Sequence, residues 1–341
     1  MQHIKHQHGV QTAVKINPEI SVVIITYNQE EFIGQTLEGA LQQNLDIPCE
    51  IIVADDCSTD NNFEVITAFQ KKYPGRIRAI RNEQNLGLLK NYKNAIETCR
   101  GKYIAVCGGD DFWHDRDKLK LQYSFLRENQ DYAVIHCDYD LLLGNKLMKN
   151  YHKKMKTVIP VGDVFDELLQ RNFIVASTTM FRADVFRKCV DLDDYISHNF
   201  FSEDYASWME ISKAAKIGYL NRSTTTYRVL AESLSRSADF WKVLKNFNRA
   251  MFHDYNYIAR KHGAQPVTDL WRKAGFIHLL IDQSFKHKVD LGLAECRAFS
   301  KGNKLDRKRK IKLFLASLAS FARIYSRYSA AEINERISKS D

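Results

Sequence analysis

The sequence predicts an α/β protein in which a mostly parallel, Rossmann-like sheet is flanked by helices and followed by a C-terminal helical extension. Two observations carry this prediction. Short β-branched runs alternate with amphipathic stretches up to about residue 238, as in repeated strand–helix–strand units. Beyond residue 239 the apolar residues recur at helical spacing only. We therefore expect a polar N-terminal tail (1–17), an α/β domain (18–238) and a helical, basic region (239–341).

The first four strands and the helices between them are the clearest elements. The run 20–26, Ile-Ser-Val-Val-Ile-Ile-Thr, is almost continuously apolar, which is typical of a strand buried on both faces. Ser58, Thr59 and Asp60 are residues that favour the start of a helix. In chain order the sequence predicts strands at 20–26, 50–54, 76–80 and 103–106, and helices at about 32–41, 60–72 and 87–99.

Polar clusters follow three of these strands at the point where each strand ends. They are residues 26–28, the pair Asp55 and Asp56, and the pair Asp110 and Asp111. Because ligands of open α/β sheets bind at the carboxyl ends of the strands, the clusters predict one site at this edge. The alternative is that each cluster serves only turn and helix-cap chemistry. Gly108 and Gly109 soften the turn before the second pair, whose carboxylates suit a hard divalent cation.

The second half of the α/β domain is less regular. Residues 140–160 are rich in lysine without a clear period, and we expect an irregular, mobile excursion over the site. Residues 176–182 are strand-like, and Thr178 or Thr179 either packs within that strand or touches substrate. Glu203 and Asp204 open a predicted helix, where acids are also favoured by the helix dipole.

Composition narrows the class of protein. The chain has 341 residues, of which 45% are apolar, enough for a full core. Its seven cysteines are scattered without metal-ligand spacing, which indicates reduced thiols and a cytoplasmic protein. The N-terminal residues lack a signal-peptide core, and no run approaches the ~20 apolar residues of a membrane span.

The basic charge is concentrated in the C-terminal region. Residues 240–341 hold 21 lysines and arginines against 9 acids, in a chain whose net charge is +9. A predicted helix at about 304–328 combines basic residues with an apolar face that includes Phe314, Leu318 and Phe321. Such a helix binds an anionic membrane surface or, alternatively, packs on the domain. No aromatic platform or recognition motif accompanies the charge, so we expect no nucleic-acid partner.

Five motifs occur in order within residues 18–236: Val-Ile-Ile-Thr-Tyr-Asn (23–28), Val-Ala-Asp-Asp-Cys-Ser-Thr-Asp (53–60), Asn-Leu-Gly (85–87), Gly-Asp-Asp-Phe-Trp (109–113) and Glu-Asp (203–204). Together they resemble the family 2 glycosyltransferases, inverting enzymes of GT-A fold. The resemblance implies that residues 18–238 form a GT-A catalytic domain, in which two short strands at 217–220 and 225–228 follow the helix that starts at the Glu-Asp motif. It also implies transfer of a sugar from a nucleoside-diphosphate sugar, expected to be UDP-linked, to a hydroxyl of a glycan or lipid-linked glycan. The expected setting is surface polysaccharide synthesis at the inner face of a bacterial membrane.

The resemblance also implies roles for individual residues. Tyr27 would stack on the base and Asp55 would accept a hydrogen bond from it. Asp204 would act as general base on the acceptor hydroxyl, with Glu203 as the alternative. Asp110 and Asp111 would hold Mg²⁺ or Mn²⁺. The full nucleotide-sugar set is Thr26, Tyr27, Asn28, Asp55, Asp56, Asn85, Gly87 and Asp110.

Two departures from the family pattern weaken these assignments. Gly108 occupies a position where the family commonly has an acid, so the ribose or metal contact of that acid is either lost or supplied by water. The histidine that many relatives carry near Leu230 or Ala231 is absent, and only Ser233 and Ser235 offer hydroxyls there.

Two other functions remain open. A nucleotidylyltransferase would also use an α/β sheet and acidic metal ligands, but it needs a glycine-rich phosphate loop, and residues 26–29 are not one. A non-catalytic sugar-nucleotide sensor or membrane-associated protein could keep the fold. The acids at 110, 111, 203 and 204 speak against that second reading.

Overall fold

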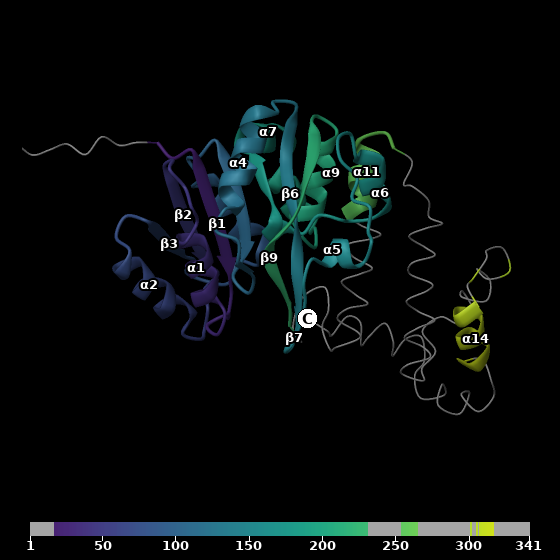
Figure 1. Ribbon diagram of the computed structural model, residues 1–341, viewed down its shortest axis with the longest axis horizontal. Helices are drawn as coiled ribbons and strands as arrows, with labels where there is room; N and C mark the ends of the chain where they lie inside the picture. The colour runs from purple at the N-terminus through teal and green to yellow at the C-terminus, as the bar shows by residue number, and fades with distance from the viewer. Residues whose placement is uncertain (1–16, 231–253, 265–300, 302–304, 306, 317–341) are drawn as a thin grey trace, which may run out of the picture.

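The structure, a computed structural model, describes residues 17–230, 254–264, 301, 305 and 307–316 (Figure 1). Within these residues nine strands form one sheet in the order β3-β2-β1-β4-β8-β6-β9-β5, and β7 pairs with β6. The strands are β1 (Ile20–Thr26), β2 (Cys49–Asp55), β3 (Ile77–Arg81), β4 (Tyr103–Gly108), β5 (Phe112–Trp113), β6 (Tyr132–Leu143), β7 (Lys146–Met148), β8 (Met180–Arg182) and β9 (Lys216–Val229).

Half of the neighbouring strand pairs are parallel, and they include the whole run β3-β2-β1-β4, which confirms the predicted α/β class. β1 pairs in parallel with β2 and β4, and β2 with β3. β8 is antiparallel to both of its neighbours, β4 and β6, so β6 runs in the same direction as β4. β9 is parallel to β6. The carboxyl ends of β1, β2, β3, β4, β6 and β9 therefore lie at one edge of the sheet.

Helices cover both faces of the sheet (Figure 1). In β1, Val23 belongs to one buried cluster with α3, α6, α7, α8, α9 and α11, while Ile24 belongs to the other with α1, α2 and α4. This alternation is the pattern of a strand buried on both sides. The helices are α1 (Ile33–Leu41), α2 (Asn62–Lys72), α3 (Leu88–Glu97), α4 (Lys118–Glu128), α5 (Tyr151–Lys154), α6 (Phe165–Gln170), α7 (Ala183–Cys189), α8 (Leu192–Ser197), α9 (Asp204–Ser212), α11 (Tyr255–Lys261) and α14 (Arg307–Ala316).

Two predictions for the second half of the domain were wrong in detail. The strand expected at 176–182 is a 3₁₀ turn, η1 (Ala176–Thr178), followed by the shorter β8. Thr178 and Thr179 are fully buried, and their hydroxyls donate to backbone oxygens three residues earlier, so both are structural. The two strands expected at 217–228 form one long strand, β9, whose pairing with β6 is interrupted by register shifts.

The lysine-rich segment 140–160, expected to be irregular, instead contains the end of β6, the strand β7 and the helix α5. β6 continues to Leu143, turns through Gly144 and Asn145, and pairs back through β7. Gly144 has a φ of 55°, which suits a two-residue hairpin loop. The Asp138 carboxylate then accepts hydrogen bonds from the backbone N–H groups of His152 and Lys153, and so fixes α5.

Several predictions fall on parts of the chain that lie outside the described residues. These are the polar tail up to residue 16, the serines at 233 and 235, most of the helical region 239–341 and the ends of the helix expected at 304–328. The described helix α14 covers part of the last of these. No helix in the described segments is both long and apolar enough to cross a membrane.

Candidate functional site

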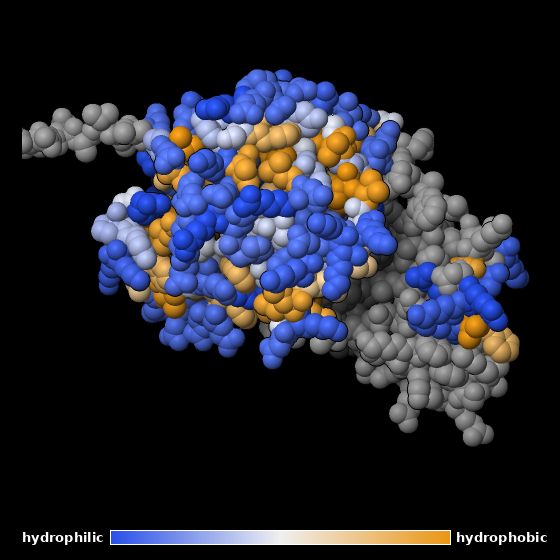
Figure 2. Space-filling view, in the orientation of Figure 1, coloured by the Kyte–Doolittle hydropathy of each residue, from blue (hydrophilic) through white to orange (hydrophobic). Residues whose placement is uncertain are grey.

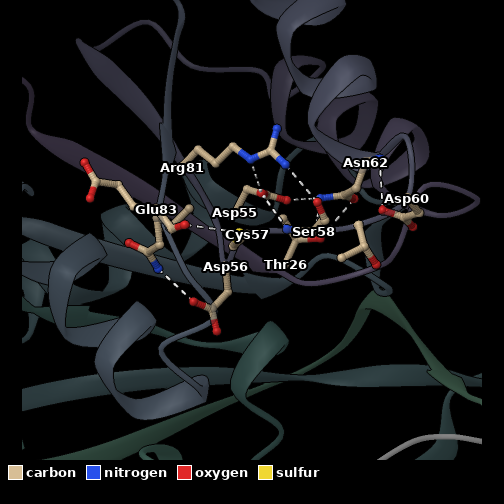
Figure 3. Close-up of polar contacts among 12 residues, drawn as sticks. Thr26, Asp55, Asp56, Cys57, Ser58, Asp60, Asn62, Arg81 and Glu83 are labelled. Carbon is tan, nitrogen blue, oxygen red and sulfur yellow. Dashed lines mark hydrogen bonds and ion pairs between the residues drawn. The ribbon is translucent and has the colours of Figure 1, made fainter.

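The loops after β1 and β2 form one hydrogen-bonded unit (Figure 3). The Thr26 hydroxyl lies 3.1 Å from Asn62 Oδ1, and Asn62 Nδ2 donates to Asp55 Oδ1 at 2.7 Å. Asp55 Oδ2 accepts the backbone N–H of Ser58 at 3.0 Å and lies 3.6 Å from Nε of Arg81. Asp55 is completely buried. Its buried carboxylate thus holds the loop after β1 and the loop after β2 in place from the protein interior.

Asp56 fixes the start of α3. Its Oδ1 accepts from Asn82 and from the backbone N–H of Leu86, and its Oδ2 accepts from the backbone N–H of Gly87 at 2.8 Å. Asn85 Oδ1 also lies 3.1 Å from the Gly87 nitrogen. Gly87 has a φ of 82°, a conformation that strongly favours glycine. The predicted residues Asp56, Asn85 and Gly87 therefore form a single turn.

Tyr27 and Asn28 lie on the solvent side of this unit. The Tyr27 side chain is 43% exposed. Asn28 has a φ of 52°, and its side-chain oxygen accepts the backbone N–H of Thr59 at 2.8 Å, while its own N–H donates to Ser58 Oγ at 2.9 Å. The two loops thereby hold an exposed aromatic ring on a fixed backbone, an arrangement suited to stacking a flat ligand.

The Asp110–Asp111 turn lies directly against the first loop. A Cβ atom added to Gly109 would fall 2.6 Å from the Thr26 hydroxyl oxygen, so only glycine allows this approach. Thr36 Oγ1 in α1 lies 2.8 Å from the carbonyl oxygen of Gly109 and 2.6 Å from that of Asp111. The Asp110 side chain is partly exposed, and the Gln29 side chain hydrogen-bonds to it. Burial raises the pKa of Asp110.

Asp111 is buried, and both of its oxygens accept hydrogen bonds from the protein. Oδ2 accepts from the Ser177 hydroxyl at 2.5 Å and Oδ1 from the backbone N–H of Arg228 at 2.9 Å. Ser177 Oγ also lies 3.1 Å from the Gly108 nitrogen. Burial, reinforced by the neighbouring Asp110, raises the pKa of Asp111 to about 8. Asp111 thus joins η1, β9 and the turn, whereas Asp110 is the acid that solvent reaches.

Arg228 completes the turn, and the sequence analysis gave it no role. Its guanidinium lies between the rings of Phe32 and Phe112, 5.0 and 4.7 Å from their centroids. It donates to the Asp110 carbonyl oxygen and to Gln35 Oε1. The guanidinium places a buried positive charge beside the two acids, and its contacts come from α1, β5 and the turn between β4 and β5.

Glu203 and Asp204 lie at the start of α9, against α3. Glu203 is buried, and no group in the described part of the chain hydrogen-bonds to its Oε2. Burial, with Asp204 beside it, raises the pKa of Glu203 to about 8. Asp204 is partly exposed, accepts from the Ser202 hydroxyl at 2.9 Å, and also has a pKa raised by burial. Burial raises the pKa of Tyr92 in α3, and the neighbouring Glu203 and Asp204 add to this effect.

The structure thus unites most of the predicted residues. Thr26, Asn28, Asp55 and Asp56 share one network, and Gly109 brings Asp110 and Asp111 to it. No hydrogen bond or ion pair among the described residues joins Glu203 or Asp204 to Asp110 or Asp111, and the pair lies near Tyr92 of α3. A separate cavity of about 810 Å³ between α3, α7, α8 and α9 contains none of the predicted site residues.

A divalent cation fits this site only with help from other ligands. In the described ranges no three His, Cys, Asp or Glu side chains are grouped as a metal site. Mg²⁺ is commonly held by one or two carboxylates together with water and substrate phosphates. Asp110, with an accessible carboxylate, suits that arrangement. Asp111 is adjacent, but its oxygens already accept from Ser177 and Arg228.

Sequence comparison places this site within a known family. Residues 21–190 match the family described as Glycosyl transferase family 2. An uncharacterized protein of Mycobacterium bovis is 30% identical over 228 residues, which are 65% of this chain and 64% of the relative, so this chain spans about two thirds of that protein's length. A putative teichuronic acid biosynthesis glycosyltransferase, TuaG of Bacillus subtilis, is 27% identical over 72% of this chain and 90% of its own.

Solved structures share the fold at low sequence identity. Staphylococcus aureus TarS in complex with UDP-GlcNAc superposes with a TM-score of 0.53 and 18% identity, over 89% of this chain and 81% of that one. The mannosyltransferase PcManGT of Pyrobaculum calidifontis, in complex with GDP-Man and Mn²⁺, gives a TM-score of 0.59 and 13% identity, over 95% and 87% of the two chains. These matches support the expected GT-A-like architecture.

Proposed function

The chain belongs to glycosyl transferase family 2, and from this premise we propose that it is an inverting glycosyltransferase. It transfers a sugar from a nucleoside-diphosphate sugar to a hydroxyl of a glycan or lipid-linked glycan. One observation carries the proposal: Gly109 brings the Asp110–Asp111 turn into contact with Thr26, in the loop that also exposes Tyr27. An aromatic ring and an accessible carboxylate at one sheet edge suit a base and a diphosphate on the same ligand.

The geometry supports a division of work among the predicted donor residues. Tyr27 stacks on the base, because its ring is exposed on a fixed backbone. Asp55 and Asp56 act from beneath by fixing the two loops, since their oxygens already accept hydrogen bonds from the protein. Asp110 faces the ribose or the diphosphate.

Asp110 is the foremost ligand for Mg²⁺ or Mn²⁺, with Asp111 beside it. When bound there, the cation supplies Lewis-acid stabilisation of the negative charge that builds on the departing diphosphate. Arg228 adds a fixed positive charge on the protein side, and its contacts with Asp110 and Gln35 keep the turn in place. Asp111 positions that turn through Ser177.

Asp204 takes the proton of the attacking acceptor hydroxyl. It is the more exposed acid of its pair, and its raised pKa makes it a better proton acceptor than an ordinary aspartate. Burial raises the pKa of Glu203 to about 8, which favours the proton on Glu203 and the negative charge on Asp204. Attack on the face opposite the diphosphate gives single displacement with inversion.

The relatives support the proposed setting. The name of TuaG refers to teichuronic acid biosynthesis. We propose that this chain likewise acts in the synthesis of a surface polysaccharide, on a lipid carrier at the cytoplasmic face of the membrane. TarS and PcManGT were solved with UDP-GlcNAc and GDP-Man. We propose a UDP-linked donor and treat GDP as the alternative to be tested.

The function is tested by ligand-induced stabilisation followed by product analysis. The full chain is heated with UDP, GDP, CDP and dTDP, each with and without Mn²⁺, because a ligand of the native state raises the melting temperature. We expect UDP with Mn²⁺ to give the largest shift. Asp110→Asn should abolish the Mn²⁺-dependent part of that shift while the protein remains folded, because an amide is a poorer ligand for a hard cation.

The reaction products separate the proposal from its rival. With a UDP-sugar and a suitable acceptor, a glycosyltransferase releases UDP, whereas a nucleotidylyltransferase working on a sugar phosphate and a nucleoside triphosphate releases pyrophosphate. Pyrophosphate release, or equal stabilisation by UDP in the parent and Asp110→Asn with or without Mn²⁺, would overturn the assignment. Stabilisation without any turnover would favour the sensor.

A further inference from the structure

The hairpin formed by the end of β6 and by β7 carries an unusual combination of exposed side chains. Leu143 is 54% exposed and Leu147 is 46% exposed, although both are large and apolar. Lys146 and Lys149 are exposed beside them. Figure 2 shows apolar and hydrophilic surface side by side at the lower end of the molecule, where Figure 1 places β7.

The strand register puts the two leucines on opposite faces of the hairpin. Leu143 pairs with Lys146, and Leu142 pairs with Leu147. Side chains of directly paired residues share a face, and successive residues alternate between faces. A protein or glycan partner docked on one face would therefore leave one leucine in water. Only an environment that surrounds the hairpin tip, such as the surface layer of a lipid bilayer, would bury both leucines at once.

The charge around the tip has a single sign. Residues 141–162 contain five lysines, at 146, 149, 153, 154 and 156, and no aspartate or glutamate. All five are exposed, and none forms an ion pair with another residue in the part of the chain that the structure describes. Lysines near an anionic bilayer contribute about 1 kcal/mol each. The two leucines require a partner with an apolar interior, and the lysines require a partner with a negatively charged surface.

The hairpin is also held in place, so it can present these side chains. The Asp140 carboxylate accepts from the backbone N–H of Asn150 at 2.8 Å and from the Ser223 hydroxyl at 2.5 Å. Tyr139 stacks on Tyr151 with ring centroids 5.1 Å apart. These contacts tie both ends of the hairpin to β9 and α5. Little conformational freedom remains to be lost when the tip binds.

The hairpin also lies at the sheet edge that carries the candidate site. β6 runs in the same direction as β4, whose end leads into the Asp110–Asp111 turn. Leu142 is paired with Arg228 of β9, the residue that contacts that turn. From these observations we propose that residues 143–149 form a docking tip that inserts into the surface of an anionic lipid bilayer. The tip holds the candidate site against the membrane, and this inference does not depend on the sugar-transfer reaction.

Vesicle binding by the full-length chain tests the proposal. We compare the parent with a charge variant, Lys146→Gln with Lys149→Gln, and with an apolar variant, Leu143→Asn with Leu147→Asn. The matched control, Lys71→Gln with Lys120→Gln, removes the same charge from exposed positions on α2 and α4. Affinities for phosphatidylglycerol and phosphatidylcholine vesicles are measured by co-sedimentation, and melting temperatures verify folding.

We expect the parent to bind phosphatidylglycerol vesicles, to ignore phosphatidylcholine and to weaken as salt rises. The charge variant should bind about 25-fold more weakly, the effect of two lysines at about 5-fold each. The apolar variant should lose at least about 10-fold through its two leucines. The control should stay within about twofold of the parent.

Three outcomes would overturn the docking tip. The first is that the parent binds both lipids with equal affinity, and the second is that the apolar variant binds as tightly as the parent. The third is that the control loses as much affinity as the charge variant. Binding of polygalacturonate that depends on the lysines but not on the leucines, with no binding to vesicles, would assign the surface to an acidic polysaccharide instead.

Discussion

The pair Glu203 and Asp204 shows how one local difference in burial separates two similar side chains. Glu203 is buried and its Oε2 accepts no hydrogen bond from a described residue, whereas Asp204 is partly exposed and accepts from Ser202. An ionised carboxylate without partners is costly inside a protein, so Glu203 holds its proton. Burial of Glu203 therefore favours a single negative charge on the pair, carried by Asp204.

That proton has a measurable effect on stability. The pKa of Glu203 rises from 4.5 to about 8 on folding, so the folded state binds more protons than the unfolded state between these values. The parent therefore loses stability as pH rises through this window, by up to about 1.4 kcal/mol per pH unit. Glu203→Gln should remove this slope. The melting temperature of the variant, relative to that of the parent, should therefore rise from pH 5 to pH 8. The exposed Glu64→Gln is the control, and a constant difference across the window would contradict the assignment.

Turnover separates the two acids. Asp204→Asn should leave the affinity for UDP-sugar near that of the parent but lower kcat by roughly 10²-fold to 10⁴-fold, the usual contribution of a general base. Since burial raises the pKa of Asp204 above 3.8, kcat of the parent should fall at a higher pH on the acid side than an ordinary aspartate gives. A variant that keeps most of its rate would transfer the role to Glu203 or to another acid.

At the scale of the element, α4 contains a buried cation that forms no ion pair with any residue that the structure describes. Lys118 is completely buried. Its Nζ donates to Gln122 Oε1 at 2.7 Å and lies 4.2 Å from the centre of the Trp113 ring. Trp113 in turn donates to the Ser177 carbonyl oxygen at 2.8 Å. Lys118 thereby links α4 to the elements that hold Asp111.

The charge of Lys118 should be visible in alkaline solution. Burial lowers its pKa from 10.5 to about 8, so between these values the unfolded state binds more protons and stability rises with pH. Lys118→Met should abolish this rise, seen as a flat unfolding free energy from pH 8 to 10.5. Lys120→Met on the exposed side of α4 should retain it. Parallel pH profiles for the parent and Lys118→Met would show that the buried ammonium is not penalised.

At the scale of the whole molecule, two surfaces present basic and exposed apolar residues together. One is the docking tip, and the other is α14, where Ile311 and Phe314 are 50% and 65% exposed and the basic residues are at 307–310 and 312. Two linked contacts with one surface reinforce each other, because the second binds at a high effective concentration.

We therefore expect Ile311→Asn with Phe314→Asn to weaken binding to phosphatidylglycerol vesicles, and the combination with the apolar tip variant to weaken it further than either alone. The measurement is co-sedimentation at fixed salt. If the α14 variant unfolds at lower temperature and binds vesicles like the parent, the helix is a packed structural element, the alternative that its sequence also allows.

The sequence predicted the parts of the fold that depend on local pattern. Strand β1 could be recognised because burial on both faces requires an apolar run, and the clusters after β1, β2 and β4 meet because parallel strands share an edge. The roles of Ser177 and Arg228 could not be predicted. They bond to Asp111 across 66 and 117 residues of chain, and nothing near either residue indicates that partner. The same distant contacts turn 176–178 into η1, against its strand-like composition.

The pairing of Leu142 with Arg228 has a consequence for the choice of acceptor. Three residues separate this pair from the tip of the hairpin at Asn145, and a strand advances about 3.3 Å per residue, so the acidic turn lies roughly 10 Å from the tip. A tip seated in the interfacial layer, which is about 5–7 Å deep on each side of a bilayer, would keep the reaction at a nearly constant height just above the headgroups. The hairpin would then set the distance between the candidate site and the membrane. A hydroxyl one or two sugars from a lipid anchor would reach the site, whereas the far end of a long polymer would not.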